Sequence, residues 1–132
     1  IIIDQMNRIY PAIAAFLGML TIILGAFGAH ALKDLLDMES FQSFETGVRY
    51  MMYHVLGILL INSGNLLSDK SKTRISQLFL VGILFFSGSI FVIALDLIPA
   101  QKIWFITPLG GLFFILGWLI AAISFLKSNE NN

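Results

Sequence analysis

Four long apolar stretches set the strongest limit on what this chain can fold into. Residues 9–32, 50–68, 75–95 and 103–126 contain no Asp, Glu, Lys or Arg, and they are 24, 19, 21 and 24 residues long. A helix needs roughly 20 apolar residues to cross a hydrocarbon core of about 30 Å. In lipid, a helix satisfies its backbone N–H and C=O groups within one segment. The sequence therefore predicts an all-α, polytopic membrane protein with four transmembrane helices.

The composition excludes an ordinary soluble domain. Hydrophobic residues make up 58% of the 132 residues and charged residues 12%, whereas soluble chains are about 45–50% apolar and about 25% charged. The absence of cysteine excludes disulfides and thiolate chemistry. Eight basic residues balance eight acidic ones, so the net charge does not indicate nucleic-acid binding. We therefore expect a lipid bilayer around the chain and no nucleic-acid partner.

The first apolar stretch is interpreted as a membrane anchor. Arg8 precedes it, and Ala29-His30-Ala31 resembles the cleavage site of a signal peptide. The apolar part of a signal peptide is about 7–15 residues long, however, and this stretch is longer. Because the chain starts at Ile1 rather than Met, we expect a few native residues to precede it.

Prolines and polar residues divide the chain into its expected elements. We expect one membrane domain over residues 1–132, with a tail at 127–132 and helices at about residues 9–32, 41–67, 75–96 and 107–126. Pro11 would lie in the first turn of the first helix, where proline is tolerated. Thr107 and Pro108 predict the N-cap and first position of the last helix.

Small residues, most of them at seven-residue spacing, occur in every predicted helix. The predicted helix-packing residues are Gly18, Gly25, Gly28, Gly57, Gly64, Gly82, Ser89, Gly110 and Gly117. A seven-residue period keeps one stripe facing a neighbour in a left-handed supercoil. Small residues on that stripe allow the backbones to approach closely. The pattern predicts a compact left-handed four-helix bundle with no wide channel in a single copy.

The basic residues predict the orientation. With four spans, one side of the membrane would hold Arg8, Lys70, Lys72, Arg74 and Lys127, and the other Lys33, Arg49 and Lys102. The side richer in Lys and Arg is usually cytoplasmic. We therefore expect a multi-pass protein of the plasma or inner membrane with both termini in the cytoplasm.

Four ionisable side chains in or near the apolar stretches are the candidate functional cluster: His30, Glu45, Arg49 and His54. An unpaired Arg is costly in hydrocarbon. We therefore expect Arg49 to pair with Glu45, four residues earlier, and to tie the second helix to the His30 end of the first. His54 would point into the bundle, either as a hydrogen-bonded structural residue or as a group that binds a proton or ligand.

No known catalytic or cofactor pattern accompanies this cluster. Two histidines without a second ligand three or four residues away are a poor metal site. The glycines of residues 25–30 do not open a helix after a strand, as a nucleotide-binding loop would. We therefore predict no metal, no cofactor and no catalytic residue.

Five short motifs resemble one known family. They are Gly25-Ala-Phe-Gly-Ala-His30, Tyr50-Met-Met-Tyr-His54, Ser87-Gly-Ser89, Thr107-Pro-Leu-Gly-Gly111 and Gly117-Trp118. In order and spacing they are similar to the small bacterial membrane proteins of domain of unknown function 423, whose vertebrate relatives resemble transmembrane protein 256. The resemblance spans roughly residues 9–126 and implies a four-helix integral membrane protein. It implies no particular reaction, substrate or cofactor.

Three classes of function remain open. The sequence favours a structural or accessory component, either a minor subunit or an assembly partner of a larger membrane complex, with other subunits or further copies of the chain as partners. The first alternative is an oligomeric small transporter or channel that uses His30, Arg49 and His54. The second is a membrane enzyme acting on a lipid or quinone, whose acid–base chemistry the two histidines would supply only in part. A non-enzymatic role is thus favoured but not decided.

Overall fold

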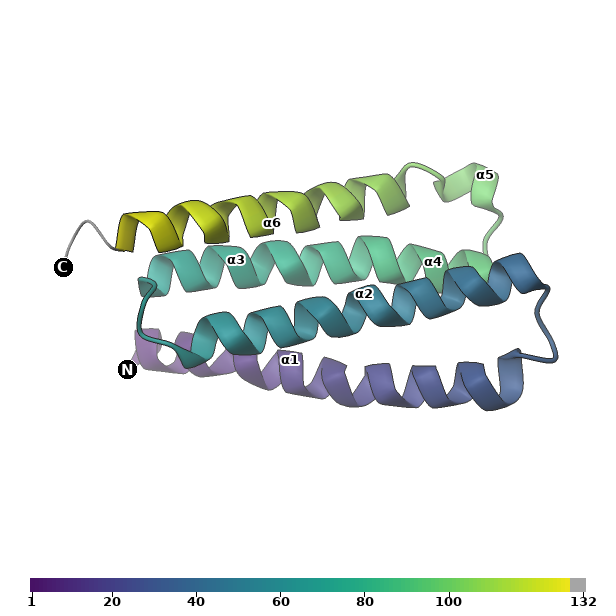
Figure 1. The fold of residues 1–132 in the computed structure, drawn as a ribbon, viewed down its shortest axis with the longest axis horizontal. Coiled ribbons are helices and arrows are strands. Elements are labelled where there is room, and N and C mark those ends of the chain that lie inside the picture. The colour runs from purple at the N-terminus through teal and green to yellow at the C-terminus, as the bar shows by residue number, and fades with distance from the viewer. Residues whose placement is uncertain (129–132) are drawn as a thin grey trace.

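The computed structural model describes residues 1–128, apart from the side chains of Ile3, Met6 and Asn7, and all its regular elements are helices (Figure 1). In chain order they are α1 (Ile2–Phe27), η1 (Gly28–Leu32), α2 (Met38–Ser63), α3 (Asp69–Gly82), η2 (Ile83–Ser87), α4 (Gly88–Ala94), α5 (Ala100–Ile103) and α6 (Ile106–Ser128). The prediction of an all-α chain is confirmed.

Within residues 1–128, three helical segments are long and apolar enough to cross a membrane. They are Arg8–Leu32, Asp69–Ala94 and Ile106–Ser128. The second of these runs through α3, η2 and α4 without a break. The helix α2 is not among them, and its first half carries Glu39, Glu45 and Arg49.

The long helices lie side by side, with α1 and α6 at opposite edges in the view of Figure 1. Between them lie α2, which packs on α1 and on the α3–η2–α4 segment alike, and the α3–η2–α4 segment itself, which packs chiefly on α6. The start of α1, the end of α6 and the α2–α3 connection share one end of the molecule, called the basic end below. The opposite end, called the α5 end, carries α5 and the α1–α2 connection.

Local capping sets where the inner helices begin. Asp37 accepts a hydrogen bond from the backbone N–H of Ser40, and Ser68 accepts one from that of Ser71. Such caps satisfy N–H groups that have no partner inside the helix. The helices therefore start at Met38 and Asp69, several residues before the expected starts at residues 41 and 75. Their first turns consist of polar and charged residues that precede the apolar stretches.

Two other boundaries differ from the sequence expectation. The helix α1 starts at Ile2, so Pro11 lies within it rather than in its first turn. Thr107 lies in the first turn of α6, and its hydroxyl pairs with that of Ser89 at 2.5 Å instead of capping the helix.

The segments η1 and η2 are π-helical turns, which widen the helix and which the hydrophobic pattern did not predict. In η1, the backbone N–H of Lys33 bonds to the carbonyl of Gly28, five residues earlier, at 3.1 Å.

The α3–η2–α4 segment ends at Ala94, and Asp96, two residues later, has a φ of 55°. There the N–H of Leu97 bonds to the carbonyl of Val92, which closes the helix end.

The core lies along α2 and α3. Its fully buried side chains include Phe44, Val55, Ile58, Ile75 and Phe79. Large apolar side chains on the outer faces of α1 and α6 are exposed instead, among them Phe16, Ile22, Ile115, Leu119 and Leu126. Apolar side chains both in the core and on the outer faces suit helices that are surrounded by lipid.

Candidate functional site

A glycine–phenylalanine seam joins the α3–η2–α4 segment to α6. Its pairs, from the basic end to the α5 end, are Gly117 with Phe79, Gly82 with Phe114, Gly110 with Phe86, and Thr107 with Ser89. From one pair to the next, the residue number rises by three or four along α3–η2–α4 and falls by the same amount along α6. Glycine on one side faces a ring or backbone on the other, so the two antiparallel helices approach closely.

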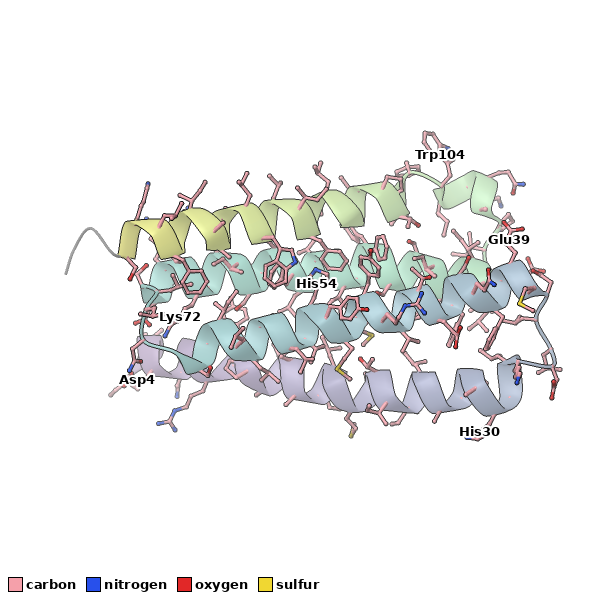
Figure 2. The ribbon with its side chains drawn as sticks, viewed as in Figure 1. Asp4, His30, Glu39, His54, Lys72 and Trp104 are labelled. Atoms are coloured by element: carbon pink, nitrogen blue, oxygen red, sulfur yellow. The ribbon has the colours of Figure 1, made fainter. Side chains whose placement is uncertain are left out.

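His54 lies beside this seam, between α2 and α6 (Figure 2), and only 3% of its surface is exposed. The indole Nε1 of Trp118 donates a hydrogen bond to Nε2 of His54 at 3.0 Å. Because an indole nitrogen only donates, Nε2 carries no proton. The proton is therefore on Nδ1, which donates to the carbonyl oxygen of Tyr50 at 2.6 Å. These two bonds fix a neutral imidazole in one tautomer.

Aromatic rings enclose the His54 imidazole. The Phe114 ring stacks on it with centroids 3.5 Å apart and planes within 7°. Phe79 meets it edge-on at 5.0 Å. Gly57 makes room for this arrangement, since a Cβ there would lie 3.1 Å from Phe79 and 3.5 Å from Trp118. The site is thus a packed aromatic cluster around one polar contact.

Further side-chain hydrogen bonds tie the other helices together. Ser87 donates to the carbonyl oxygen of Gly47 at 2.7 Å, linking η2 to α2. Asn62 donates to Ser76 at 2.9 Å, and Gln77 donates to Tyr10 at 2.9 Å. Among the described residues, every buried side-chain nitrogen and oxygen has a hydrogen-bond partner. Ser87, Asn62 and Gln77 therefore each join two helices.

Arg49 and Glu45 lie apart from the aromatic cluster. Both line a groove of about 260 Å³ between α1 and α2, together with Gly25 and Gly28. The hydrogen bond that Arg49 makes is to the hydroxyl of Thr46, at 3.0 Å and one turn earlier, rather than to the expected partner Glu45. Its side chain is exposed beside α1.

The four residues of the candidate cluster thus occupy three places. Glu45 and Arg49 share the α1–α2 groove, and His54 belongs to the aromatic cluster. His30 is exposed on η1 at the α5 end (Figure 2). Within residues 1–128, no group of three His, Cys, Asp or Glu side chains lies close enough to hold a metal ion.

The predicted packing glycines differ in how closely their neighbours approach. A Cβ on Gly28 would lie 2.9 Å from Phe44, whereas one on Gly18 or Gly25 would lie 3.3 or 3.5 Å from a valine methyl group. Gly64 follows the end of α2 and would have open space around its Cβ, so it belongs to no helix contact.

The sequence reasoning missed several site residues. The sequence pattern gives Trp118 only as part of the Gly117-Trp118 motif, yet it is the hydrogen-bond partner of His54. Gly47 was not among the packing residues, although a Cβ there would lie 2.7 Å from Phe91. Its position on the same helical face as His54 was the available signal.

Comparison with known proteins identifies the family of this chain. A family model described as "Protein of unknown function (DUF423)" matches residues 24–111, two thirds of the chain. The chain belongs to the DUF423 family. The resemblance predicted from the sequence motifs is confirmed.

Relatives of this DUF423 chain are named as membrane proteins. A UPF0382 membrane protein of Haemophilus influenzae is 33% identical over 125 residues, which cover 95% of this chain and 99% of that protein. One of Staphylococcus epidermidis is 37% identical over 123 residues, covering 91% and 97%. The UPF0382 inner membrane protein YgdD of Escherichia coli is 32% identical over 127 residues, covering 92% of each. No solved structure matches the chain.

Proposed function

We propose that this DUF423 protein is a structural or accessory component of a larger membrane assembly. The observation that carries the proposal is the bonding of His54, the one ionisable side chain among the buried residues of the described chain. Both of its ring nitrogens are used, one on Tyr50 and one on Trp118. A histidine held in this way joins two helices and has no nitrogen left for a substrate or a transported proton.

The exposed apolar faces of α1 and α6 support the same proposal. They lie at opposite edges of the molecule (Figure 1), and both carry large apolar side chains such as Ile22 and Ile115, each 64% exposed. Two such faces offer neighbouring subunits a contact on either side. The transporter and enzyme alternatives stay predictions. The transporter alternative would use His30, Arg49 and His54, which lie in three separate places among the described residues.

In this proposal α2 is a fourth span, so the chain forms a four-helix, left-handed bundle. The 26 residues of α2 reach about 39 Å at a rise of 1.5 Å per residue, more than a hydrocarbon core requires. It packs against α1 on one side and the α3–η2–α4 segment on the other. The seven-residue repeat of the seam, from Gly82 to Ser89 and from Gly110 to Gly117, favours left-handed crossing.

Four spans place the basic end on one side of the membrane, and the Lys and Arg residues there favour the cytoplasm. The chain contains no cysteine, so a single introduced cysteine reports one position. In intact cells, Asn65→Cys at the basic end should resist an impermeant thiol reagent, and Leu35→Cys in the α1–α2 connection should react. The reverse labelling would overturn this orientation, and equal protection of both would overturn four spans.

Photo-crosslinking tests the accessory role. A photoreactive amino acid in place of Ile22 or Ile115 should give one discrete product with a larger protein in native membranes, in high yield from at least one face. The same group at Leu35, an exposed connection residue, is the control and should not give it. A product of two copies of this chain alone would favour the oligomeric transporter instead. Adducts to lipid alone would contradict the accessory role.

A further inference from the structure

A pocket lies at the basic end, between the α2–α3 connection, α3 and the last turns of α6. Its volume is about 700 Å³. The hydroxyl of Ser128 donates to the carbonyl oxygen of Leu66 at 2.6 Å, which joins the end of α6 to the connection across the pocket. The walls are therefore held by a contact between segments that are far apart in the sequence.

Three basic side chains line this pocket, and no Asp or Glu among the described residues does. Lys70 and Arg74 come from α3, where their four-residue spacing places them on one face. Lys127 comes from the last turn of α6, on the other wall. All three residues are exposed, so the described lining concentrates positive charge.

Hydroxyl groups complete the polar part of the lining. Ser68 donates from its hydroxyl to that of Ser71 at 3.0 Å, which leaves the Ser71 hydroxyl proton free to donate. Ser124 lines the α6 wall. Ammonium, guanidinium and hydroxyl donors converging on one space suit the oxygens of a phosphate.

Part of the lining is apolar. Leu67, Ile120 and Ile123 form it, and Ile123 lies on the face of α6 that is open to lipid. Basic and hydroxyl side chains next to apolar ones at the end of membrane helices match the level where phospholipid headgroups meet their acyl chains. Basic pockets between membrane helices are a known setting for anionic headgroups.

We propose that this pocket binds one anionic phospholipid, with its phosphate between Lys70, Arg74 and Lys127 and the start of an acyl chain on Ile120 and Ile123. Charge complementarity selects an anionic headgroup, since a zwitterionic one would bring an ammonium group toward three cations. The apolar part of the lining selects a lipid over a free anion. The site lies apart from the His54 cluster, so it neither requires nor alters the accessory role.

Native mass spectrometry of the delipidated full chain in detergent tests the proposal. Phosphatidylglycerol and phosphatidylcholine with the same acyl chains are the probes, and inorganic phosphate is the free-anion competitor. The parent should bind one phosphatidylglycerol at least about tenfold more tightly than phosphatidylcholine. Arg74→Gln with Lys127→Gln, one change on each wall, should abolish that preference.

The matched control is Arg8→Gln with Lys72→Gln, which removes two charges at the same end outside the pocket lining. This variant should keep the preference. Equal loss in both double variants would overturn the pocket in favour of general surface charge. Equal binding of the two lipids by the parent would overturn anionic selection. Displacement of the lipid by inorganic phosphate at equal concentration would overturn a lipid as the occupant.

Discussion

Two helix pairs in this protein use glycine in opposite ways. In the seam between α3–η2–α4 and α6, atoms of the partner helix occupy the space beside each glycine. A Cβ on Gly110 would meet the backbone of Phe86, and one on Gly117 would lie 2.5 Å from Phe79. In the α1–α2 pair, a Cβ on Gly25 would meet only a methyl group of Val48, at an ordinary 3.5 Å. A groove of about 460 Å³ stays open beside Gly25.

The difference comes from the residue that faces each glycine. A phenylalanine ring fills the space beside Gly82 and Gly117, and the backbone of Phe86 fills the space beside Gly110. Beside Gly25 only a valine methyl group approaches, and it leaves part of the space open. The same seven-residue glycine spacing therefore gives a filled seam in one pair and a partly open one in the other. Spacing identifies the face that meets a neighbour, and the opposing residue decides how tightly it packs.

The largest expected effect tests the tight seam at its closest point. In Gly110→Ala, the new methyl group overlaps the backbone of Phe86, so one helix must move. We expect the free energy of unfolding in detergent to fall by about 3 kcal/mol, the upper part of the usual overpacking range. Gly64→Ala is the control, because its Cβ has open space and should change stability by less than about 0.5 kcal/mol. Equal stability of both variants would contradict the seam.

A second prediction compares the two pairs directly. Gly117→Ala should lower the free energy of unfolding by about 1–3 kcal/mol, because Phe79 must change its position. Gly25→Ala should leave it unchanged or raise it by less than about 1 kcal/mol, since the methyl group fits and alanine favours the helix. Both variants are measured by reversible denaturation under the same conditions. A loss at Gly25 equal to that at Gly117 would show that the α1–α2 pair is as tight as the seam.

The third prediction concerns the polar contact beside the seam. Trp118→Phe removes the N–H that His54 accepts and keeps most of the ring. Hydrogen bonds between membrane helices contribute about 0.6 kcal/mol on average and at most about 1.7, so we expect a loss of about 1 kcal/mol. In a His54→Leu background the same change should cost clearly less, since the acceptor is gone. An equal cost in both backgrounds would assign the effect to packing alone.

Much of the fold could be predicted from the sequence because length and hydropathy decide it. Charge-free stretches located the helices, and the glycine spacing located the faces of the seam that contain Gly82, Gly110 and Gly117. The helix ends were less predictable because capping side chains, rather than charges, set them. Asp37 and Ser68 are residue types that cap helices, and each accepts a hydrogen bond from the backbone N–H of the serine three residues later. These two residues were therefore the sequence signal for the helix starts.

The site was less predictable for a geometric reason. Whether Trp118 faces His54 depends on the rotation and axial offset of α6 relative to α2, and spacing within one helix fixes neither. The expected pair of Arg49 with Glu45 depended on spacing along one helix, but Thr46 lies one turn from Arg49 as well and accepts its hydrogen bond. The wide turns η1 and η2 have no signature in the hydrophobic pattern.

The smallest expected effect is a difference in pH dependence between the N-caps of the two inner helices. The cap of α2 is the charged residue Asp37, and the cap of α3 is the neutral residue Ser68. Hydrogen bonds to Asp37, first from the backbone N–H of Ser40 and then from its hydroxyl, hold the pKa of this exposed carboxyl below its ordinary 3.8. The unfolded chain then binds more protons near that pH, so the stability that Asp37 contributes is full above about pH 5 and is lost as the pH falls through the folded pKa.

Asp37→Asn keeps a capping oxygen but removes the charge that titrates. Melting temperatures measured between about pH 6 and pH 3 should therefore fall less steeply for this variant than for the parent. Ser68→Ala removes the neutral cap of α3 and should lower the melting temperature by the same amount at every pH, because the serine hydroxyl does not titrate in this range. An Asp37→Asn curve parallel to that of the parent would show that the charge of Asp37 contributes nothing to the start of α2.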